Sequence, residues 1–315
     1  MVKYILKRLG MMLLTLFVIV TIAFLVLRLM PGSPYDDPNL SSEAVAALEA
    51  KAHLNEPIWV QYGYFLKGVI FEGDWGVSTQ IRPGVDAFTI IKERVPATML
   101  LNILSLLISL PLGILAGTFA AVFKSKMPDH AISVLVVICI SVPSFVFASL
   151  MQYFLAGKVG MFPIIYNTTG SLGHRLWSMV LPVLALSFNP IATVCRYLRG
   201  ELIETLSSEY MLLARTKGLK KYQAVVRHAF RNSMVPLANI IIPMFTNILG
   251  GSLVVESLFA VPGLGGIIVD AISASDYSLA IASLLFYSII SLATILVVDI
   301  SYGIIDPRIR LGDKQ

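Results

Sequence analysis

The stretch Arg199–Asn232, RGELIETLSSEYMLLARTKGLKKYQAVVRHAFRN, is a polar interruption in a chain otherwise dominated by long apolar runs. It carries eight Arg or Lys when Arg196, just before it, is counted. Glu209 suits the positive end of a helix. Gly218 suits the end of that helix, because glycine enters the left-handed backbone region at little cost. The stretch therefore predicts two short helices hinged at Gly218, the second covering about residues 221–229.

Two interpretations of this polar stretch are open from its pattern alone. Ser207 or Ser208 is a good N-cap for the first helix. A hinged, basic, amphipathic helix pair is suited to binding a partner in the cytoplasm. A solvated loop that only satisfies charge topology would look much the same.

The composition places the chain among membrane proteins. It has 315 residues, of which 57% are hydrophobic and 14% charged, and its mean hydropathy is +0.80. A soluble domain usually has about 25% charged residues. The net charge of +5 is no sign of nucleic-acid binding, because the basic residues are distributed by membrane side.

The apolar runs predict an all-α protein with six transmembrane helices, since a bilayer span needs about 20 mainly apolar residues. The six predicted spans are Leu9–Leu29, Ala97–Phe123, Ala131–Ala156, Met179–Tyr197, Met234–Glu256 and Leu279–Ile305. A further apolar region, Leu258–Ile272, contains Pro262 and several glycines, so a re-entrant or interfacial segment is expected there.

Arg and Lys counts predict the orientation of the spans. With the N-terminus inside, the inner segments hold 16 of these residues and the outer segments seven, leaving Arg28 uncounted near the outer end of the first span. Both termini and the polar stretch are therefore expected in the cytoplasm. The region Pro31–Pro96 then lies outside, with a helix expected from Glu43 to His53, capped by Ser42.

The sequence lacks the motifs of an enzyme. It has no GxxxxGK[ST] phosphate loop and no HExxH motif, and its four histidines have no metal-ligand spacing, so no metal site is predicted. Energy for any transport must come from another chain or from an ion gradient. A secondary carrier working alone is the alternative class, although the spans hold few ionisable residues near the membrane midplane.

Four polar residues within the predicted spans are candidates for lining a pathway or forming a gate: Asn102, Gln152, Asn247 and Asp299. Asp299 and Asp306 share a helix face, so a cytoplasmic gate held through an arginine is one interpretation. A buried structural role for Asp299 inside the bundle is the other.

The polar stretch resembles the cytoplasmic loop of binding-protein-dependent ABC permeases. The general loop pattern is Glu-Ala-Ala, three residues, Gly, nine residues, Ile-x-Leu-Pro. Aligned on Gly218, this chain keeps Ala214 but has Leu212 and Leu213 before it, and His228 stands where Ile is usual. The variant EYMLLARTKGL followed by VVRHAFRNSMVPL is similar to the oligopeptide, dipeptide and nickel branch of the family.

Other segments resemble the same branch in order along nearly the whole chain. They are KRLGMMLLTLFVIVTIAFLVLRLMPGSP, LNEPIWVQYGYFLKGVIFEGDWGVS, ERVPATMLL, VESLFAVPGLGGIIVDAISASDY and DPRIRLG. The second of these is a feature of the first (B-type) of the two permease subunits.

The resemblance implies a type I ABC importer permease in the bacterial cell membrane, a non-catalytic subunit. Its expected division is a first span (1–30), an extracytoplasmic segment (31–93), a permease core (94–305, with a coupling loop at 199–233) and a cytoplasmic tail (306–315). Implied partners are a homologous permease, two cytoplasmic ATPase subunits that bind the ATP and Mg, an extracytoplasmic substrate-binding protein and the lipid bilayer. No cofactor in this chain and no nucleic-acid partner are implied.

The resemblance also implies that the helix pair around Gly218 docks on an ATPase subunit. Ala214 and Gly218 would permit close docking, with Arg215 and Lys217 beside them. The coupling residues implied are Glu209, Tyr210, Ala214, Arg215, Lys217, Gly218, Leu219, His228, Arg231 and Asn232, of which His228, Arg231 and Asn232 would tie the second helix to the bases of the spans. Members of this branch carry di- and oligopeptides, nickel and metallophore complexes, or glutathione-like molecules, and peptides are the expected cargo.

Overall fold

The structure is a computed structural model that describes residues 2–29, 33–35, 41–216, 218, 223, 225 and 229–305. Every element named in these ranges is a helix, and the extended pairing they contain is an isolated bridge between Val77 and Asp86. The prediction of an all-α protein is thereby confirmed for the described part of the chain. The chain divides into unit 1, Met1–Pro96 with Gly263–Leu296, and unit 2, Ala97–Pro262 with Val297–Gln315.

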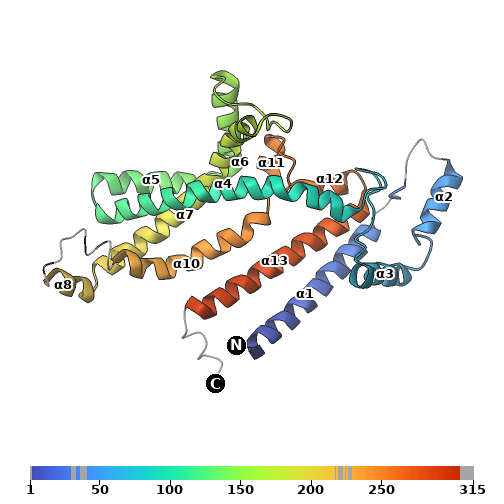
Figure 1. The fold of residues 1–315 in the computed structure, drawn as a ribbon, viewed down its shortest axis with the longest axis horizontal. Helices are drawn as coiled ribbons and strands as arrows, with labels where there is room; N and C mark the ends of the chain where they lie inside the picture. The colour runs from blue at the N-terminus through green and yellow to red at the C-terminus, as the bar shows by residue number, and fades with distance from the viewer. Residues whose placement is uncertain are drawn as a thin grey trace. The chain divides into compact units, whose positions relative to one another are not determined.

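Unit 1 contains the first long helix and the segment that follows it (Figure 1). Its elements are α1 (Val2–Leu29), α2 (Ser42–Lys51), α3 (Ile58–Lys67), the π-helix η1 (Gly68–Glu72), α12 (Ile267–Ser273) and most of α13 (Tyr277–Ile305). Helix α2 begins one residue earlier than predicted, and its N-cap is Ser41, not Ser42. The Ser41 hydroxyl accepts a hydrogen bond from the backbone N–H of Ala44 at 3.2 Å.

The core of unit 1 joins α1 to α3 through aromatic side chains. Phe24 is 3% exposed, and its ring lies 5.2 Å from that of Tyr62 and 5.1 Å from that of Phe65. At the start of α13, the fully buried Asp276 carboxylate accepts hydrogen bonds from the Ser78 hydroxyl and from the backbone N–H groups of Gln80 and Ile81. These contacts fix the extended segment before α4 against α13.

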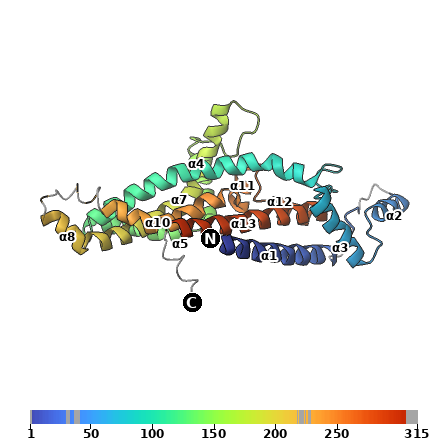
Figure 2. The same ribbon diagram turned by 60° about the horizontal axis from the view of Figure 1, so that its bottom comes forward.

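Unit 2 contains most of the remaining helices. They are α4 (Ala87–Val122, which starts in unit 1), α5 (Met127–Ser141), α6 (Ser144–Met151), the π-helix η2 (Gln152–Lys158), α7 (Leu172–Leu206), α8 (Glu209–Thr216), α10 (Phe230–Thr246), the short 3-10 helix η4 (Asn247–Leu249) and α11 (Leu253–Leu258). Helix α7 packs against α5, α6 and α10 (Figures 1 and 2). Its position inside the unit explains why so many of its side chains are buried.

Two glycines set the close approach of α4 to α7. A Cβ atom on Gly113 would lie 2.8 Å from the Cβ atom of Val194, and one on Gly117 would lie 2.8 Å from the carbonyl oxygen of Cys195. Small residues at such positions let two helix backbones approach closely. The Ser105 and Ser187 hydroxyls, 3.2 Å apart, add a polar contact along the same interface.

Four of the six predicted spans correspond to helices long and apolar enough to cross a membrane: α1, α4, α7 and α13. The third predicted span is instead a pair, α5 with the helix running from Ser144 to Lys158, bent by 99° where Pro143 interrupts the backbone. The fifth is α10, which has 17 residues and is followed by η4 and by Gly251 at φ +65. The structure thus gives four such helices, or five with the bent pair, in its described part.

Candidate functional site

The polar stretch begins as the last turns of α7, which continues to Leu206 before the chain turns into α8. Helix α8 starts at Glu209 and ends at Thr216, and Gly218 has a φ of +86. The predicted helix and its left-handed stop at Gly218 are both confirmed. The predicted side-chain cap is not what the structure contains, because the Ser208 hydroxyl donates backward to the Thr205 carbonyl, at 2.5 Å.

Helix α8 has two different faces. Met211, 2% exposed, belongs to a buried cluster with Leu198 and Leu202 of α7. Leu212 and Leu213 follow directly, and they are 64% and 56% exposed. One face of α8 is therefore fixed to the base of α7, while two large apolar side chains on the other are left exposed by the described part of the chain.

The start of α10 is tied to the base of α7. The Ser233 hydroxyl, fully buried, donates to the Thr205 hydroxyl oxygen at 3.1 Å. Arg231 and Asn232, expected to make such a tie, are exposed in the first turn of α10. Among the described residues, Ser233 bonds to α7 here. The sequence did not predict this role for Ser233.

An ion pair at the base of α5 and α7 was not anticipated from the sequence. The Arg199 guanidinium donates from Nε to one Asp129 carboxylate oxygen at 2.6 Å and from an Nη atom to the other at 2.8 Å. The Ser125 N–H adds a third bond to Asp129, at 2.9 Å. Asp129 is 2% exposed, so this carboxylate is buried and satisfied by its partners. The contact fixes α7 to α5 close to where α8 departs.

Several predicted coupling residues lie outside the described part of the chain. Glu209 is exposed as the first residue of α8. Lys217, Leu219 and His228 lie outside the described residues, as do the side chains of Tyr210, Ala214 and Arg215.

Two of the four pathway candidates donate hydrogen bonds from their side-chain amides to backbone carbonyls. The Asn102 side chain donates to the carbonyls of Thr98 and Ile248, at 3.0 and 2.9 Å, which places it beside the turn that carries Asn247. The Gln152 side chain donates to the carbonyls of Ile164 and Leu258, both at 2.9 Å.

The other two pathway candidates are placed only by their backbone elements. Asn247 opens η4, and its side chain lies outside the described residues, whereas Asp299 lies in α13. Within the described ranges, no group of three or more His, Cys, Asp or Glu residues is arranged to hold a metal ion.

Comparison with known proteins covers the chain from end to end. Residues 109–311 match the family described as binding-protein-dependent transport system inner membrane component. Residues 1–110 match the N-terminal part of membrane components of such transport systems.

Individual relatives match over their full length. The chain is 41% identical over 311 residues to the dipeptide transport system permease protein DppB of Lactococcus lactis subsp. cremoris, covering 99% of this chain and 100% of that protein. It is 34% identical over 315 residues to the DppB protein of Bacillus subtilis, covering 100% of both. It is 34% identical over 314 residues to the oligopeptide transport system permease protein OppB of Escherichia coli, covering 98% of this chain and 100% of that protein.

Proposed function

Because the chain belongs to the family of binding-protein-dependent transport system inner membrane components, we propose that it is one of two homologous permease subunits that together form the pathway of an ATP-driven importer. Six spans cross the bacterial cell membrane, with both termini in the cytoplasm. The excess of Arg and Lys in the inner segments, 16 against seven, supports this orientation. The third and fifth spans are then broken helices, α5 with α6 and η2, and α10 with η4 and α11.

The partners follow from the family and from the chemistry that the sequence lacks. Two cytoplasmic ATPase subunits bind and hydrolyse ATP with Mg, and an extracytoplasmic binding protein delivers the cargo. This chain is non-catalytic: it forms part of the pathway for the cargo and couples that pathway to the ATPase subunits. Peptides are the cargo, because the relatives from Lactococcus lactis, Bacillus subtilis and Escherichia coli are named as dipeptide and oligopeptide permeases.

Different parts of the chain have different roles in this proposal. Residues 1–30 form the first span and 31–93 the extracytoplasmic segment. Residues 94–305 form the permease core, with the coupling loop at 199–233, and 306–315 form the tail. The amides of Asn102 and Gln152 lie where helices of the core break, which suits residues that hold the shape of a pathway.

The observation that carries the proposal is the two-faced helix α8. Exposed leucines on a polar cytoplasmic loop are costly in water, and Leu212 and Leu213 together present a small apolar surface for a partner. Met211, buried at the base of α7, connects that surface rigidly to a helix of the pathway. A displacement of α8 by the ATPase is then transmitted to α7, and through the Asp129–Arg199 pair to α5.

Substitution of Gly218 tests this coupling role. Gly218→Leu places a branched side chain at φ +86, a conformation that costs an L-residue about 1–2 kcal/mol, and adds bulk at the end of the docking helix. We expect ATP-driven peptide uptake in cells or proteoliposomes to be lost while the subunit still inserts in the membrane. Co-purification of the ATPase subunits should fall at the same time.

Gly73→Leu is the matched control. Gly73 lies exposed outside the coupling loop with a φ of +65, and a Cβ atom there meets no other atom within 4 Å. This variant should transport at the wild-type rate. Normal uptake by Gly218→Leu, or equal loss in both variants, would contradict a specific coupling role for Gly218.

A further inference from the structure

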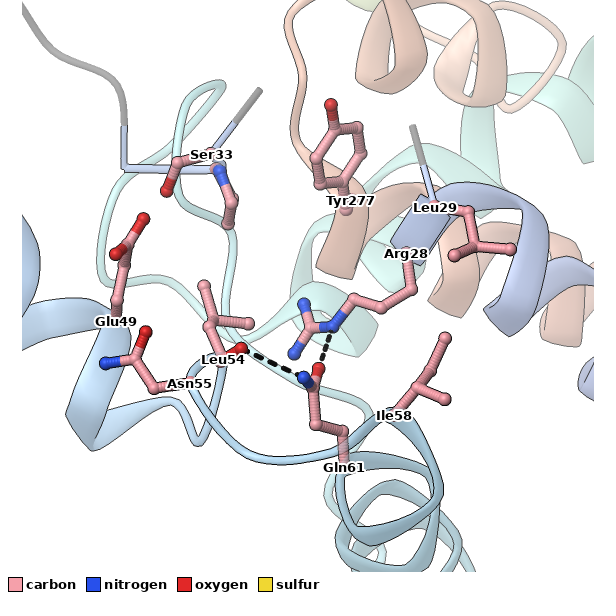
Figure 3. Close-up of a pocket in the computed structure, with 10 residues that line it drawn as sticks. Arg28, Leu29, Ser33, Glu49, Leu54, Asn55, Ile58, Gln61 and Tyr277 are labelled. Atoms are coloured by element: carbon pink, nitrogen blue, oxygen red, sulfur yellow. Dashed lines mark hydrogen bonds between the residues drawn. The ribbon is translucent and has the colours of Figure 1, made fainter. Parts of the chain in front are cut away.

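Unit 1 contains a cavity of about 510 Å³ at the end of α1 (Figure 3). This volume lies within the range of small-molecule sites. The cavity is lined by Arg28, Leu29, Ser33, Pro34, Glu49, Leu54, Asn55, Ile58, Gln61 and Tyr277. In the orientation proposed above, the end of α1 and the segment carrying α2 and α3 lie outside the cytoplasm, so the cavity lies on the side from which cargo arrives.

A chain of hydrogen bonds holds the Arg28 guanidinium in place. Its Nε donates to the Gln61 side-chain oxygen. The Gln61 side-chain nitrogen is itself fixed, because it donates to the backbone carbonyls of Leu54 at 2.9 Å and Glu56 at 2.7 Å. The guanidinium carbon also lies 5.8 Å from the centre of the Phe24 ring. The orientation of the Arg28 side chain is therefore set before any ligand arrives.

The positive charge of Arg28 has no acidic partner among the residues that the structure describes. Its Nε is used by Gln61, which leaves the N–H groups of the two terminal nitrogens beside the cavity (Figure 3). A half-buried guanidinium without an anion is costly, and its paired terminal N–H groups match the two oxygens of a carboxylate. The site is therefore prepared for an anionic group.

The rest of the lining indicates what carries that anionic group. Glu49 faces the cavity from α2 and forms no side-chain hydrogen bond or ion pair with a described residue, so one negative charge accompanies the one positive charge. Leu54 and Ile58 add apolar surface to the lining. An acidic protein loop would be repelled by Glu49, and a purely apolar ligand would leave Arg28 unpaired. A small zwitterion with an apolar body satisfies all three features.

We propose that this cavity is an extracytoplasmic binding site for free peptides, in which Arg28 binds the terminal carboxylate and Glu49 binds the terminal ammonium group. The proposal rests on the peptide cargo proposed above. The site belongs to the permease itself and does not require the binding protein.

Calorimetric titration of the assembled transporter in lipid nanodiscs, without its binding protein, tests the site. The probes are the dipeptide leucyl-leucine, its C-terminal amide and its N-acetyl form. The wild-type transporter should bind the free dipeptide at least about tenfold more tightly than either blocked form, the factor expected for one charge-assisted contact. Arg28→Gln should lose the preference over the amide, and Glu49→Gln the preference over the acetylated form.

Arg82→Gln and Glu93→Gln are matched control variants. These two residues form an exposed ion pair in the same unit and do not line the cavity, so both variants should bind all three peptides as the wild type does. Glu49→Gln removes no described contact of the fold, because the Glu49 side chain forms no hydrogen bond or ion pair with a described residue. It therefore tests the site even if Arg28→Gln does not fold.

Equal binding of the three peptides by the wild-type transporter would overturn the proposal, as would unchanged preferences in both cavity variants. Binding of glycerophosphoethanolamine with no binding of dipeptide would also overturn it, by assigning the same charges to a lipid headgroup. ATP-driven uptake of the dipeptide by the wild-type system, measured in parallel, separates the two claims. If uptake proceeds while the cavity shows no preference, the inference fails and the importer function stands.

Discussion

Two arginines, Arg199 in unit 2 and Arg28 in unit 1, show opposite ways of holding a guanidinium at least partly out of water. Arg199 has a buried carboxylate bonded to two of its nitrogens. Arg28 has a neutral amide bonded to one nitrogen and no acidic partner among the described residues. The first arrangement is complete within the chain. The second gives orientation without neutralising the charge, so it is suited to receive a ligand.

The difference suits the different roles proposed for the two sites. The satisfied ion pair between α5 and α7 contributes rigidity beside α8, the helix that we propose transmits a displacement. The Arg28 charge, oriented but without an acidic partner among the described residues, suits the ligand-binding role proposed for the cavity in unit 1. The two roles predict different changes in the free energy of unfolding when one charge is removed.

Removal of the Asp129 charge should have the largest effect on stability. Asp129→Asn leaves Arg199 without its anion, and breaking such a pair costs about 3 kcal/mol, the lower end of the usual range, because the Arg199 side chain is still 33% exposed. We expect the free energy of unfolding of the purified subunit to fall by this amount. Denaturant-induced unfolding in detergent measures it.

The double variant Asp129→Asn with Arg199→Gln sharpens the same test. Replacing both charges removes the uncompensated guanidinium, so the double variant should be more stable than Asp129→Asn alone. If the losses in the free energy of unfolding of the two single variants add up to that of the double variant, the two side chains do not interact. Asp129 would then not compensate the Arg199 charge.

Removal of the Arg28 charge should have a much smaller effect without ligand. Arg28→Gln loses the bond to Gln61 but also relieves an uncompensated charge, so the free energy of unfolding should change by less than about 1 kcal/mol. Leucyl-leucine at about 100 times its dissociation constant should stabilise the wild-type protein by about 2.7 kcal/mol and the variant much less. A loss near that of Asp129→Asn would show that Arg28 serves the fold instead.

The sequence predicted those features of the site that depend on residues close together along the chain. Gly218 was predicted to be left-handed because a helix must end near it, and α8 begins at Glu209 as its acidic first turn indicated. The ion pair of Asp129 with Arg199 joins residues 70 positions apart, and no local pattern reports such a contact. Ser233 was missed for the same reason, since its partner Thr205 lies on another helix.

Hydropathy located the apolar regions but not their breaks. Ala131–Ala156 is apolar enough to predict a single span, yet the backbone turns at Pro143, which has no N–H to continue the helix. In Met234–Glu256, α10 ends at Thr246 and Gly251 adopts a left-handed conformation. The polar side chains of Asn102 and Gln152 bond to backbone carbonyls near such breaks, a pairing that depends on the packed helices.

Site-specific crosslinking of α8 tests whether this helix docks on an ATPase subunit. In a transporter whose Cys139 and Cys195 are replaced by Ala, Leu213→Cys is labelled with a maleimide that carries a photoactivatable group. Phe71→Cys, 81% exposed in the proposed extracytoplasmic segment, is the matched control. We expect Leu213→Cys to form a covalent adduct with an ATPase subunit and Phe71→Cys to form none. Absence of an adduct from Leu213→Cys in a transporter that still imports peptide would contradict the docking of α8.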